Sequence, residues 1–198
     1  MFTGIIETTG VVKAIEKESS NLNLFIQSDI THELKIDQSV SHNGVCLTVV
    51  AIDDKVYKVT AIDETLQKTN IGQLISGSVV NLERCMPANG RFDGHIVQGH
   101  VDQIATCNKI EDLNGSWKYT FSYVSAHGNT TVEKGSVCIN GVSLTVVDSR
   151  PNEFSVAIIP YTYEHTNFKN LKVEDYVNIE FDIIGKYVAK MLDSRMIV

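Results

Sequence analysis

The stretch SVSHNGVCLTVV at Ser39–Val50 occurs again as SVCINGVSLTVV at Ser136–Val147, and nine of the twelve positions are identical. The second copy begins 97 residues after the first (136 − 39 = 97). Two further pairs of segments keep this offset: TLQKTNIGQL from Thr65 with TYEHTNFKNL from Thr162, and VVNLE from Val79 with YVNIE from Tyr176. Solenoid and propeller repeats are about 20 to 50 residues long. The longer period here predicts two similar domains in one chain.

The composition fits a globular chain that binds a small ligand. With 198 residues and 43% apolar residues, the chain is long enough for two cores of about 90 residues each. The formal net charge is −7 and the isoelectric point is about 5.3, and no Lys/Arg cluster offsets this negative charge. Such a balance argues against capture by nucleic acid or by an anionic membrane surface.

The N-terminal segment MFTGIIETTGVV has neither the basic start nor the long apolar core of a signal peptide, and no run reaches the roughly 20 apolar residues that span a bilayer. We therefore expect a cytoplasmic protein. A disulfide framework is not expected in that reducing compartment, because the cysteines are widely spaced: Cys46, Cys85, Cys107 and Cys138. His95 and His100 lack the carboxylate motif of a helical metal site, so no metal is expected.

Most of the chain consists of short runs rich in Val, Ile, Thr and aromatic residues, separated by Gly, Asn, Asp and Ser. This pattern is typical of all-β domains, either barrels or sandwiches. The expected strands are Gly10–Ile15, Leu22–Gln27, Val45–Val50, Lys55–Ala61, Val79–Arg84, Val101–Asn108, Trp117–Val124, Val142–Val147, Glu153–Ile158 and Tyr176–Phe181.

Helical periodicity is weak until the end of the chain. There Gly185 precedes KYVAKMLDSRMIV, which predicts one short amphipathic helix with an apolar face formed by Val188, Met191, Leu192 and Met196. That face either folds back on its own barrel or pairs with identical helices of other subunits. Met86–Asp93 has the composition of a linker. The expected domains are therefore 1–90 and 91–185, followed by an oligomerisation helix at 186–198.

The repeated stretch is centred on a turn. Asn43-Gly44 and Asn140-Gly141 both tolerate positive φ, which is a strong hairpin signal. Because side chains alternate along a strand, each copy has an apolar face and a polar row. The apolar residues are Leu47 and Val49 with Leu144 and Val146, and the polar row comprises Cys46, Thr48, Ser143 and Thr145. The row either lies on a solvated sheet face or contacts a ligand in each copy.

Five segments together resemble the riboflavin synthase family of the trimeric α-chain type, and the resemblance covers nearly the whole chain. They are specific as a set: MFTGIIE at the start, SVSHNGVCLTV from Ser39, GHIVQGHVD at Gly94–Asp102, KGSVCINGVSLTV at Lys134–Val146 and IPYTYEHT at Ile159–Thr166.

The resemblance implies an all-β fold of two similar six-stranded Greek-key barrels and a C-terminal helix. It implies a dismutation in which one 6,7-dimethyl-8-ribityllumazine donates four carbons to another, giving riboflavin and 5-amino-6-ribitylamino-2,4(1H,3H)-pyrimidinedione without an added cofactor. It further implies a homotrimer in which each site lies between the N-terminal barrel of one subunit and the C-terminal barrel of its neighbour. Association with lumazine synthase is a further expected partnership.

By the same resemblance, backbone groups near each copy's start and two later segments would line the pockets and hold the ribityl chains. The substrate-binding residues expected on this basis are Gly4, Ile5, Ile6, Cys46, Leu47, Thr48, Thr60, Ala61, Ile62, Asp63, Glu64, Thr65, Gly99, His100, Val101, Lys134, Ser143, Leu144, Thr145, Ala157, Ile158, Ile159, Pro160, Tyr161 and Thr162. The expected catalytic residues are Cys46, His100, Ser39 and Ser143.

The two substrates play opposite roles, so the positions at which the copies differ are informative. An offset of 97 pairs Cys46 with Ser143 and Asp37 with Lys134, and near the copy starts an offset of 95 pairs Ile5 with His100. His100 is suited to proton transfer near neutral pH, with Asp102 on the same face of an extended segment. Its alternative role is structural.

Cys46 is expected to add to the acceptor lumazine or to hold the group that does, with Ser39 orienting that nucleophile. The alternative is a small buried thiol. Thr48, Ser143 and Thr145 are expected to bond the ring rather than to carry protons. Lys134 would neutralise the pyrimidine anion or bind a ribityl chain, and is otherwise a solvated lysine.

Two other functions compete with the enzyme. Lumazine proteins and yellow fluorescent proteins resemble this family but carry a lumazine or flavin as a chromophore. Loss of the polar set in one barrel would favour that function, and here both rows are present together with His100 and Lys134. A duplicated interaction module without a small ligand would leave the matched polar rows unexplained.

Overall fold

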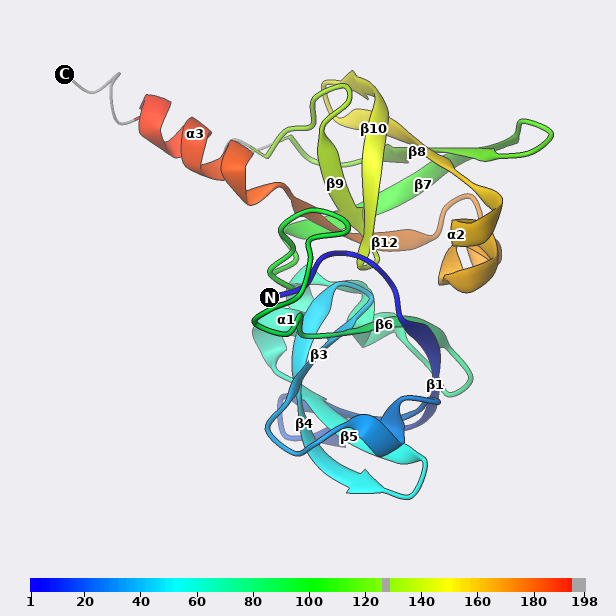
Figure 1. The fold of residues 1–198 in the computed structure, drawn as a ribbon, viewed down its shortest axis with the longest axis vertical. Coiled ribbons are helices and arrows are strands. Elements are labelled where there is room, and N and C mark those ends of the chain that lie inside the picture. Colours follow the sequence, from blue (N-terminus) through cyan, green and yellow to red (C-terminus); the bar gives the residue numbers. More distant parts are fainter. Residues whose placement is uncertain (126–128, 194–198) are drawn as a thin grey trace.

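The computed structural model describes residues 1–125 and 129–193, which form two closed antiparallel barrels followed by a helix (Figure 1). The first barrel contains β1 (Thr8–Glu18), β2 (Asn21–Gln27), β3 (Ser39–His42), β4 (Val45–Asp53), β5 (Val56–Ala61) and β6 (Val79–Arg84). The second contains β7 (Gln103–Asp112), β8 (Trp117–Ser122), β9 (Ser136–Ile139), β10 (Val142–Arg150), β11 (Glu153–Ile158) and β12 (Tyr176–Phe181).

Both barrels have the same strand order. Around the first barrel it is β1-β2-β5-β4-β3-β6, and around the second it is β7-β8-β11-β10-β9-β12. The predicted fold of two six-stranded barrels with a C-terminal helix is therefore confirmed. Closure also removes the exposed strand edges that an open sheet would present.

Short helices connect the strands, and two kinds recur at equivalent places 97 residues apart: α1 (Asp63–Lys68) with α2 (Pro160–His165), and the 3₁₀ turns η2 (Asn70–Gln73) with η3 (Asn167–Asn170). The first half also has the 3₁₀ turn η1 (Thr31–Glu33). The sequence pattern missed α1 and α2, because six residues are too few to establish a helical period. The last helix, α3, spans Ile183–Asp193. Met196, predicted to share its apolar face, lies outside the described residues.

Each barrel bends where a strand carries one extra residue. Pairing shifts at Val49/Ala51 in β4 and at Val146/Asp148 in β10, which are positions related by the 97-residue offset. Such bulges strengthen the twist that closes a small barrel. The predicted strands Val45–Val50 and Val142–Val147 stopped near these bulges, whereas β4 and β10 continue beyond them to Asp53 and Arg150.

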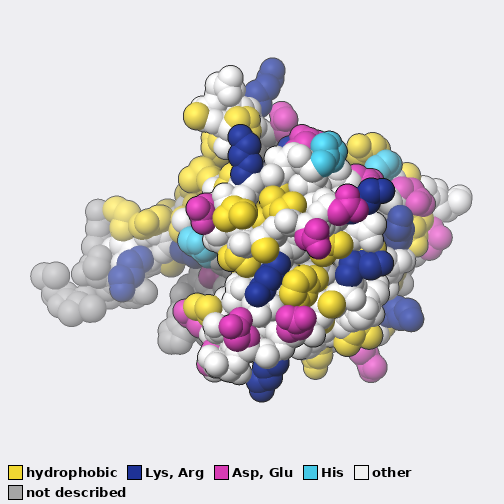
Figure 2. Space-filling model, turned by 90° about the horizontal axis from the view of Figure 1, so that it is seen from below, with side chains coloured by type: hydrophobic (Ala, Val, Ile, Leu, Met, Phe, Trp, Pro, Cys, Tyr) yellow, Lys and Arg dark blue, Asp and Glu magenta, His cyan; other side chains and the backbone are white. Residues whose placement is uncertain are grey.

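The surface does not gather one sign of charge on the face shown in Figure 2, where acidic and basic side chains are interspersed. This distribution suits a chain whose ligand is a small molecule rather than a polyanion. Within residues 1–125 and 129–193, no helix combines the length and the apolar composition needed to cross a membrane.

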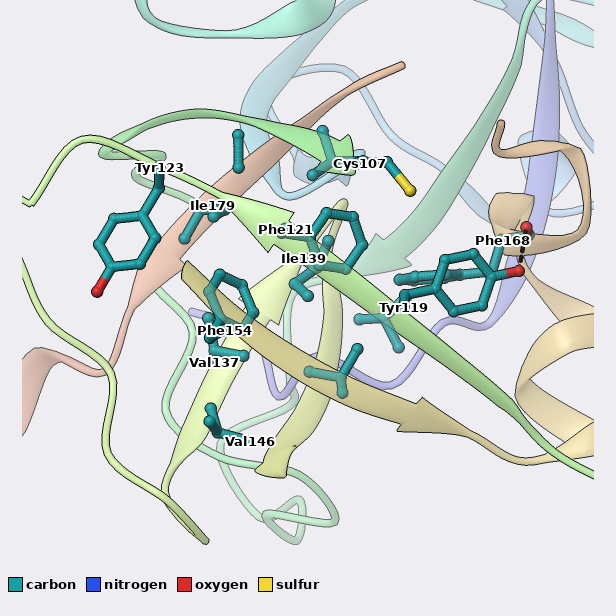
Figure 3. Close-up of a cluster of buried hydrophobic side chains, with 14 of the residues drawn as sticks. Cys107, Tyr119, Phe121, Tyr123, Val137, Ile139, Val146, Phe154, Phe168 and Ile179 are labelled. Atoms are coloured by element: carbon teal, nitrogen blue, oxygen red, sulfur yellow. Dashed lines mark hydrogen bonds between the residues drawn. The ribbon is translucent and has the colours of Figure 1, made fainter. Parts of the chain in front are cut away.

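The two barrel cores differ in composition. The first is mainly aliphatic, with Leu24, Ile26 and Val49 nearly or fully inaccessible to solvent. The second is aromatic, and Figure 3 shows Phe121 and Phe154 at its centre with Tyr119 beside Phe168. The Tyr119 hydroxyl donates to the Phe168 carbonyl at 3.1 Å, so this buried polar group is satisfied. Burial of each large side chain contributes about 1.5–3 kcal/mol.

A cluster of asparagine amides joins the two barrels. Asn81 Nδ2 donates to the Asn140 carbonyl and Asn178 Nδ2 donates to the Asn43 carbonyl, both at 2.9 Å. These two bonds are equivalent under the 97-residue offset. The two Asn-Gly turns also meet, since a Cβ added at Gly44 would lie 2.8 Å from the Gly141 nitrogen. The turn glycines are therefore required for close approach as well as for positive φ.

His42 provides a pH-dependent contribution to the stability of the first barrel. It is almost fully buried, its Nδ1–H donates to the Val40 carbonyl at 3.0 Å, and its Nε2 accepts from the Tyr57 hydroxyl at 2.8 Å. Burial lowers the pKa of His42 from 6.5 to about 4. The folded chain therefore resists protonation of this ring, whereas the unfolded chain accepts the proton.

We expect the stabilising contribution of neutral His42 to be complete above pH 6.5 and to be lost as the pH falls toward 4. The loss is about 3 kcal/mol of unfolding free energy. Denaturant titrations of the wild-type chain and of His42→Gln between pH 7 and pH 4 measure it. The wild-type advantage should shrink over this range, and two parallel curves would contradict the assignment.

Candidate active site

Two segments cross between the barrels, each reaching from one half of the chain to the other. Residues 2–6 precede the first barrel and residues 97–101 precede the second. They pair antiparallel where they pass, with the Phe2 nitrogen donating to the Val97 oxygen at 2.7 Å and the Val97 nitrogen donating to the Phe2 oxygen at 3.1 Å. Phe2 and Val97 are fully buried at this crossing.

Beyond the crossing, each segment bonds to the barrel of the other half. The Ser143 nitrogen on β10 donates to the Gly4 oxygen at 2.7 Å, and the Cys46 nitrogen on β4 donates to the Gly99 oxygen at 2.9 Å. Ile6 packs against the second core and Val101 against the first. Thus the first segment covers the second barrel, and the second segment covers the first.

Both contacts require glycine. Gly4 has φ +77° and Gly99 has φ +81°, a region that side-chain-bearing residues rarely adopt. A Cβ at Gly4 would lie 2.6 Å from Ser143 Cβ, and a Cβ at Gly99 would lie 2.6 Å from Cys46 Cβ. The polar row of each barrel therefore lies directly against backbone supplied by the opposite half.

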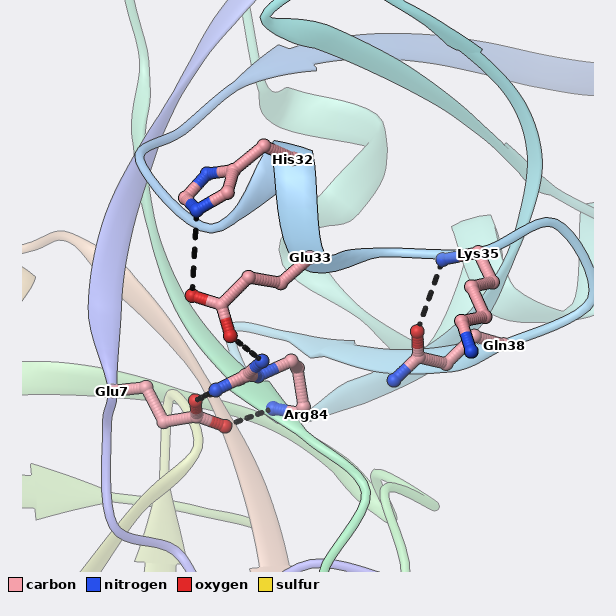
Figure 4. Close-up of polar contacts among 6 residues, drawn as sticks. All are labelled: Glu7, His32, Glu33, Lys35, Gln38 and Arg84. Carbon is pink, nitrogen blue, oxygen red and sulfur yellow. Dashed lines mark hydrogen bonds and ion pairs between the residues drawn. The ribbon is translucent and has the colours of Figure 1, made fainter.

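The start of β1, just after the first crossing segment, is fixed by an arginine. Arg84 on β6 donates through Nε to Glu7 at 2.8 Å and through Nη1 to Glu33 at 2.6 Å (Figure 4). The Arg84 backbone nitrogen also donates to Glu7 at 2.7 Å. Because the bonds to Glu7 use both the guanidinium and the main chain, they define the direction in which the segment leaves the crossing.

A cavity of about 520 Å³ opens where the second crossing segment meets the first barrel. It brings together six of the predicted substrate-binding residues: Cys46, Glu64, Thr65, Gly99, His100 and Val101. It also contains residues that the sequence analysis did not assign to the pocket: Val45, Lys68, Thr69, Gln98, Asp102, Ile183 and Lys186. The walls of the cavity are formed by β4, α1, α3 and the second crossing segment.

Cys46 is half-buried in this cavity wall. Burial raises the pKa of its thiol, and a hydrogen bond with Ser39 opposes that rise. The thiol is therefore protonated near neutral pH. Ser39, expected to orient the chemistry of Cys46, does lie beside it in the structure.

Asp102 connects the same wall to the C-terminal helix. Its Oδ2 pairs with Lys186 Nζ at 2.6 Å and accepts from the Phe181 nitrogen at 2.9 Å. The carboxylate thus pairs with α3, and Asp102 and His100 both line the cavity. His100 itself is exposed at the cavity.

The equivalent place on the second barrel contains a serine and histidine pair. His95 Nδ1 lies 2.6 Å from Ser143 Oγ, and the His95 nitrogen donates to the Thr3 oxygen at 3.1 Å. Burial lowers the pKa of His95, so its imidazole is neutral near pH 7. In the tautomer protonated at Nε2, Nδ1 accepts a hydrogen bond from the Ser143 hydroxyl.

The sequence pattern does not predict this contact, since His95 was a candidate only for a metal site. One feature of the sequence could have pointed to His95 as a site residue: the Gly-His pair occurs twice in GHIVQGHVD, at Gly94-His95 and Gly99-His100.

The other predicted residues occupy varied environments. The Leu47 side chain lies in the first core, and those of Ala61 and Ile158 are fully buried, so these three can offer only backbone groups to a ligand. Thr60 Oγ1 donates to Asn23 Oδ1 at 2.7 Å. Exposed side chains are found at Ile5, Thr48, Ile62, Asp63, Lys134, Thr145, Ala157, Ile159, Pro160 and Tyr161, while Leu144 and Thr162 are partly buried.

Comparisons with known proteins agree with this architecture. A family described as Lumazine binding domain matches residues 3–85 and again residues 98–182. The chain of a solved LumP complexed with riboflavin superposes with a TM-score of 0.84 at 26% identity, covering 91% of this chain and 98% of that one. Fold and site thus define a duplicated protein of the lumazine-binding class.

The curated relatives narrow that class. The chain is 40% identical to "Riboflavin synthase" of Bacillus amyloliquefaciens over 193 residues, covering 97% of this chain and 90% of the relative. It is also 40% identical to "Riboflavin synthase" of Actinobacillus pleuropneumoniae over the same length and shares of each chain. The chain belongs to the riboflavin synthase family.

Proposed function

We propose that this chain catalyses the dismutation of two molecules of 6,7-dimethyl-8-ribityllumazine to riboflavin and 5-amino-6-ribitylamino-2,4(1H,3H)-pyrimidinedione. The observation that carries the proposal is the pair of related sites, one on each barrel, each completed by the opposite half of the chain. A reaction between two identical molecules needs two similar binding surfaces. Holding both substrates in reactive geometry can contribute about 7–11 kcal/mol toward the barrier.

An enzyme is favoured over a chromophore carrier. The curated riboflavin synthases share 40% of their residues with this chain, whereas the LumP structure shares 26%. The side chains suited to chemistry also lie at the sites: Cys46 and His100 line the cavity of the first barrel, and Ser143 bonds His95 on the second.

The protonation states suggest different roles for the two sites. A protonated thiol is a weak nucleophile. The raised pKa of Cys46 therefore favours a role in holding a nucleophile, with Ser39, over direct addition to the ring. With Nδ1 unprotonated, the neutral His95 imidazole can accept a proton from Ser143; in the tautomer protonated at Nδ1 it donates to Ser143 Oγ and leaves the hydroxyl free to donate to a ring carbonyl. His100 is the proton carrier on the first barrel.

We further propose that the reactive pair of substrates meets between subunits of a homotrimer. The two sites are related by the chain's internal symmetry, and a second copy would bring the first-barrel site of one chain to the second-barrel site of another. Ile184, Tyr187, Val188 and Leu192 of α3 are each more than half exposed in the single chain. This apolar surface would be buried by helix pairing. Association with lumazine synthase stays a prediction.

The test of the activity is direct. Purified protein is incubated with 6,7-dimethyl-8-ribityllumazine, and riboflavin formation is followed by its visible absorbance. We expect turnover without any added cofactor. Tight binding of the lumazine without riboflavin formation would contradict the enzyme and leave the chromophore carrier.

Deletion of residues 187–198 should produce monomers without activity, because it removes Tyr187, Val188 and Leu192 from the exposed face. It retains Lys186, so the ion pair with Asp102 is preserved and the cavity wall should survive. Sedimentation gives the mass of the assembly, and the riboflavin assay gives its activity. A fully active trimer after the deletion would remove the helix from the assembly.

A further inference from the structure

Two buried glutamates occupy equivalent positions on the two barrels. Glu83 lies on β6 and Glu180 on β12, in the repeated segments VVNLE and YVNIE. Their residues are 4% and 2% exposed, respectively. Buried carboxylates are uncommon unless the protein provides partners for their oxygens. The partners here come from the two crossing segments.

Each carboxylate accepts three hydrogen bonds from one crossing segment. Glu83 accepts from the Thr3 nitrogen at 2.6 Å, from Thr3 Oγ1 at 2.9 Å and from the Gly4 nitrogen at 3.0 Å.

Glu180 accepts from the backbone nitrogens of Gln98, Gly99 and His100 at 2.6, 2.9 and 2.8 Å. Both oxygens are used in each case. Such charge-assisted bonds are stronger than bonds between neutral groups.

The same glycines carry the contact to the opposite barrel. The Gly99 nitrogen donates to Glu180 on the second barrel, while the Gly99 oxygen accepts from Cys46 on the first. Gly4 connects Glu83 on the first barrel to Ser143 on the second in the same way. One glycine residue therefore links each carboxylate to the polar row of the other barrel.

From this geometry we propose that Glu83 and Glu180 are positioning residues, each of which holds a crossing segment against the site on the opposite barrel. Glu180 fixes the segment that carries His100 over Cys46, and Glu83 fixes the segment that lies over Ser143. The inference rests on the proposed function, since it concerns the same two sites. Each site is therefore positioned by a glutamate of the opposite barrel.

The environment of the carboxylates supports this arrangement. Burial raises the pKa of both carboxyls, and the backbone N–H groups that bond them oppose the rise. The segment amides thus take the place that water has around an exposed carboxylate. A glutamine at either position would turn one acceptor oxygen into a donor facing these N–H groups.

We expect Glu180→Gln to lower kcat about 100-fold, because small displacements of a positioned group cost about that much. Glu83→Gln should act similarly through the other site. If each glutamate only stabilised its own barrel, the variants would contain less folded protein, but kcat per lumazine-binding site would be unchanged. That result would overturn the proposal.

A double-mutant cycle tests the crossed arrangement. Glu180→Gln combined with Cys46→Ser should depart from the product of the single effects by more than about threefold, and combined with Ser143→Ala it should agree within about twofold. Glu83→Gln should show the opposite pairing. Coupling of each glutamate to the site on its own barrel would overturn the proposal.

The cycle is measured with kcat/KM and also with the dissociation constant of 6,7-dimethyl-8-ribityllumazine. If the wild type binds lumazine without turnover, the proposed function fails while the binding cycle still decides the role of the glutamates. Should Glu180→Gln fail to fold, Glu180→Asp keeps the charge but is one methylene shorter, and the same coupling to Cys46→Ser is expected. Additivity of that pair would count against the proposal.

Discussion

Gly99→Ala is expected to reduce turnover about 100-fold, the effect of displacing a positioned segment. The new methyl group would lie 2.6 Å from Cys46 Cβ and 3.0 Å from the Cys46 nitrogen. It must therefore break the bond between the Cys46 nitrogen and the Gly99 oxygen, which is 2.9 Å long in the wild type. His100 follows directly and would move with the segment. Steady-state kinetics with the lumazine substrate measure the loss.

Gly77→Ala is the matched control. Gly77 has φ +92°, yet a Cβ there would meet no atom within 4 Å. This variant therefore has the left-handed strain, about 1–2 kcal/mol, without a clash at either candidate site. We expect it to lower the melting temperature and to retain turnover. Equal turnover in Gly99→Ala and Gly77→Ala would show that the contact with Cys46 has no catalytic importance.

His100→Gln should lower kcat by about 100-fold or more, since removal of a general acid or base typically costs a factor of 10² to 10⁴. Glutamine retains hydrogen bonding but cannot transfer a proton. The backbone nitrogen of residue 100 still donates to Glu180, so the segment should stay in place. Cys46→Ser should also slow turnover, because it replaces the thiol that lies beside Ser39.

Thermal unfolding of both variants separates chemistry from folding. His32→Gln serves as the control, because His32 lies on η1 with its side chain 76% exposed, and it should leave the rate unchanged. Wild-type rates in folded His100→Gln and Cys46→Ser would refute both proposed roles.

Local patterns predicted much of each barrel. The alternation after Asn43-Gly44 placed Leu47 and Val49 in the core and Cys46 outside it, as the structure has them. The strands Val79–Arg84 and Tyr176–Phe181 were predicted with the bounds they have. These results follow from period-two alternation, which depends only on neighbouring residues. The strands β3 and β9 were missed as separate elements, because four residues give little pattern.

The crossing of the two segments could not be predicted in this way. Nothing local in MFTGIIE or VQGHVD shows which barrel each segment will cover. That choice is made by contacts about 50 to 140 residues apart, such as Cys46 with Gly99, Thr3 with Glu83 and Gly4 with Ser143. The repeat aligned Ile5 with His100, but the structure was needed to place His100 over Cys46 of the first barrel.

The partner of Ser143 was missed for a related reason. His95 has no equivalent in the first half of the chain, so comparison of the copies gave it no role. The pair forms because the residues that follow the linker, Gly94 and His95, lie against Ser143 on β10. For Lys134 the opposite holds. Comparison of the copies paired it with Asp37, and both residues have a left-handed backbone, with φ 64° and 70°, but the Lys134 side chain is exposed.

In the proposed reaction two molecules of one substrate react, with one held by each kind of barrel. Chromatography of a complete reaction mixture tests it by counting lumazine consumed against both products. We expect two molecules of 6,7-dimethyl-8-ribityllumazine to be consumed for each riboflavin and each pyrimidinedione formed. Recovery of the lumazine unchanged, or riboflavin formed one for one from it, would rule out a reaction between two lumazine molecules.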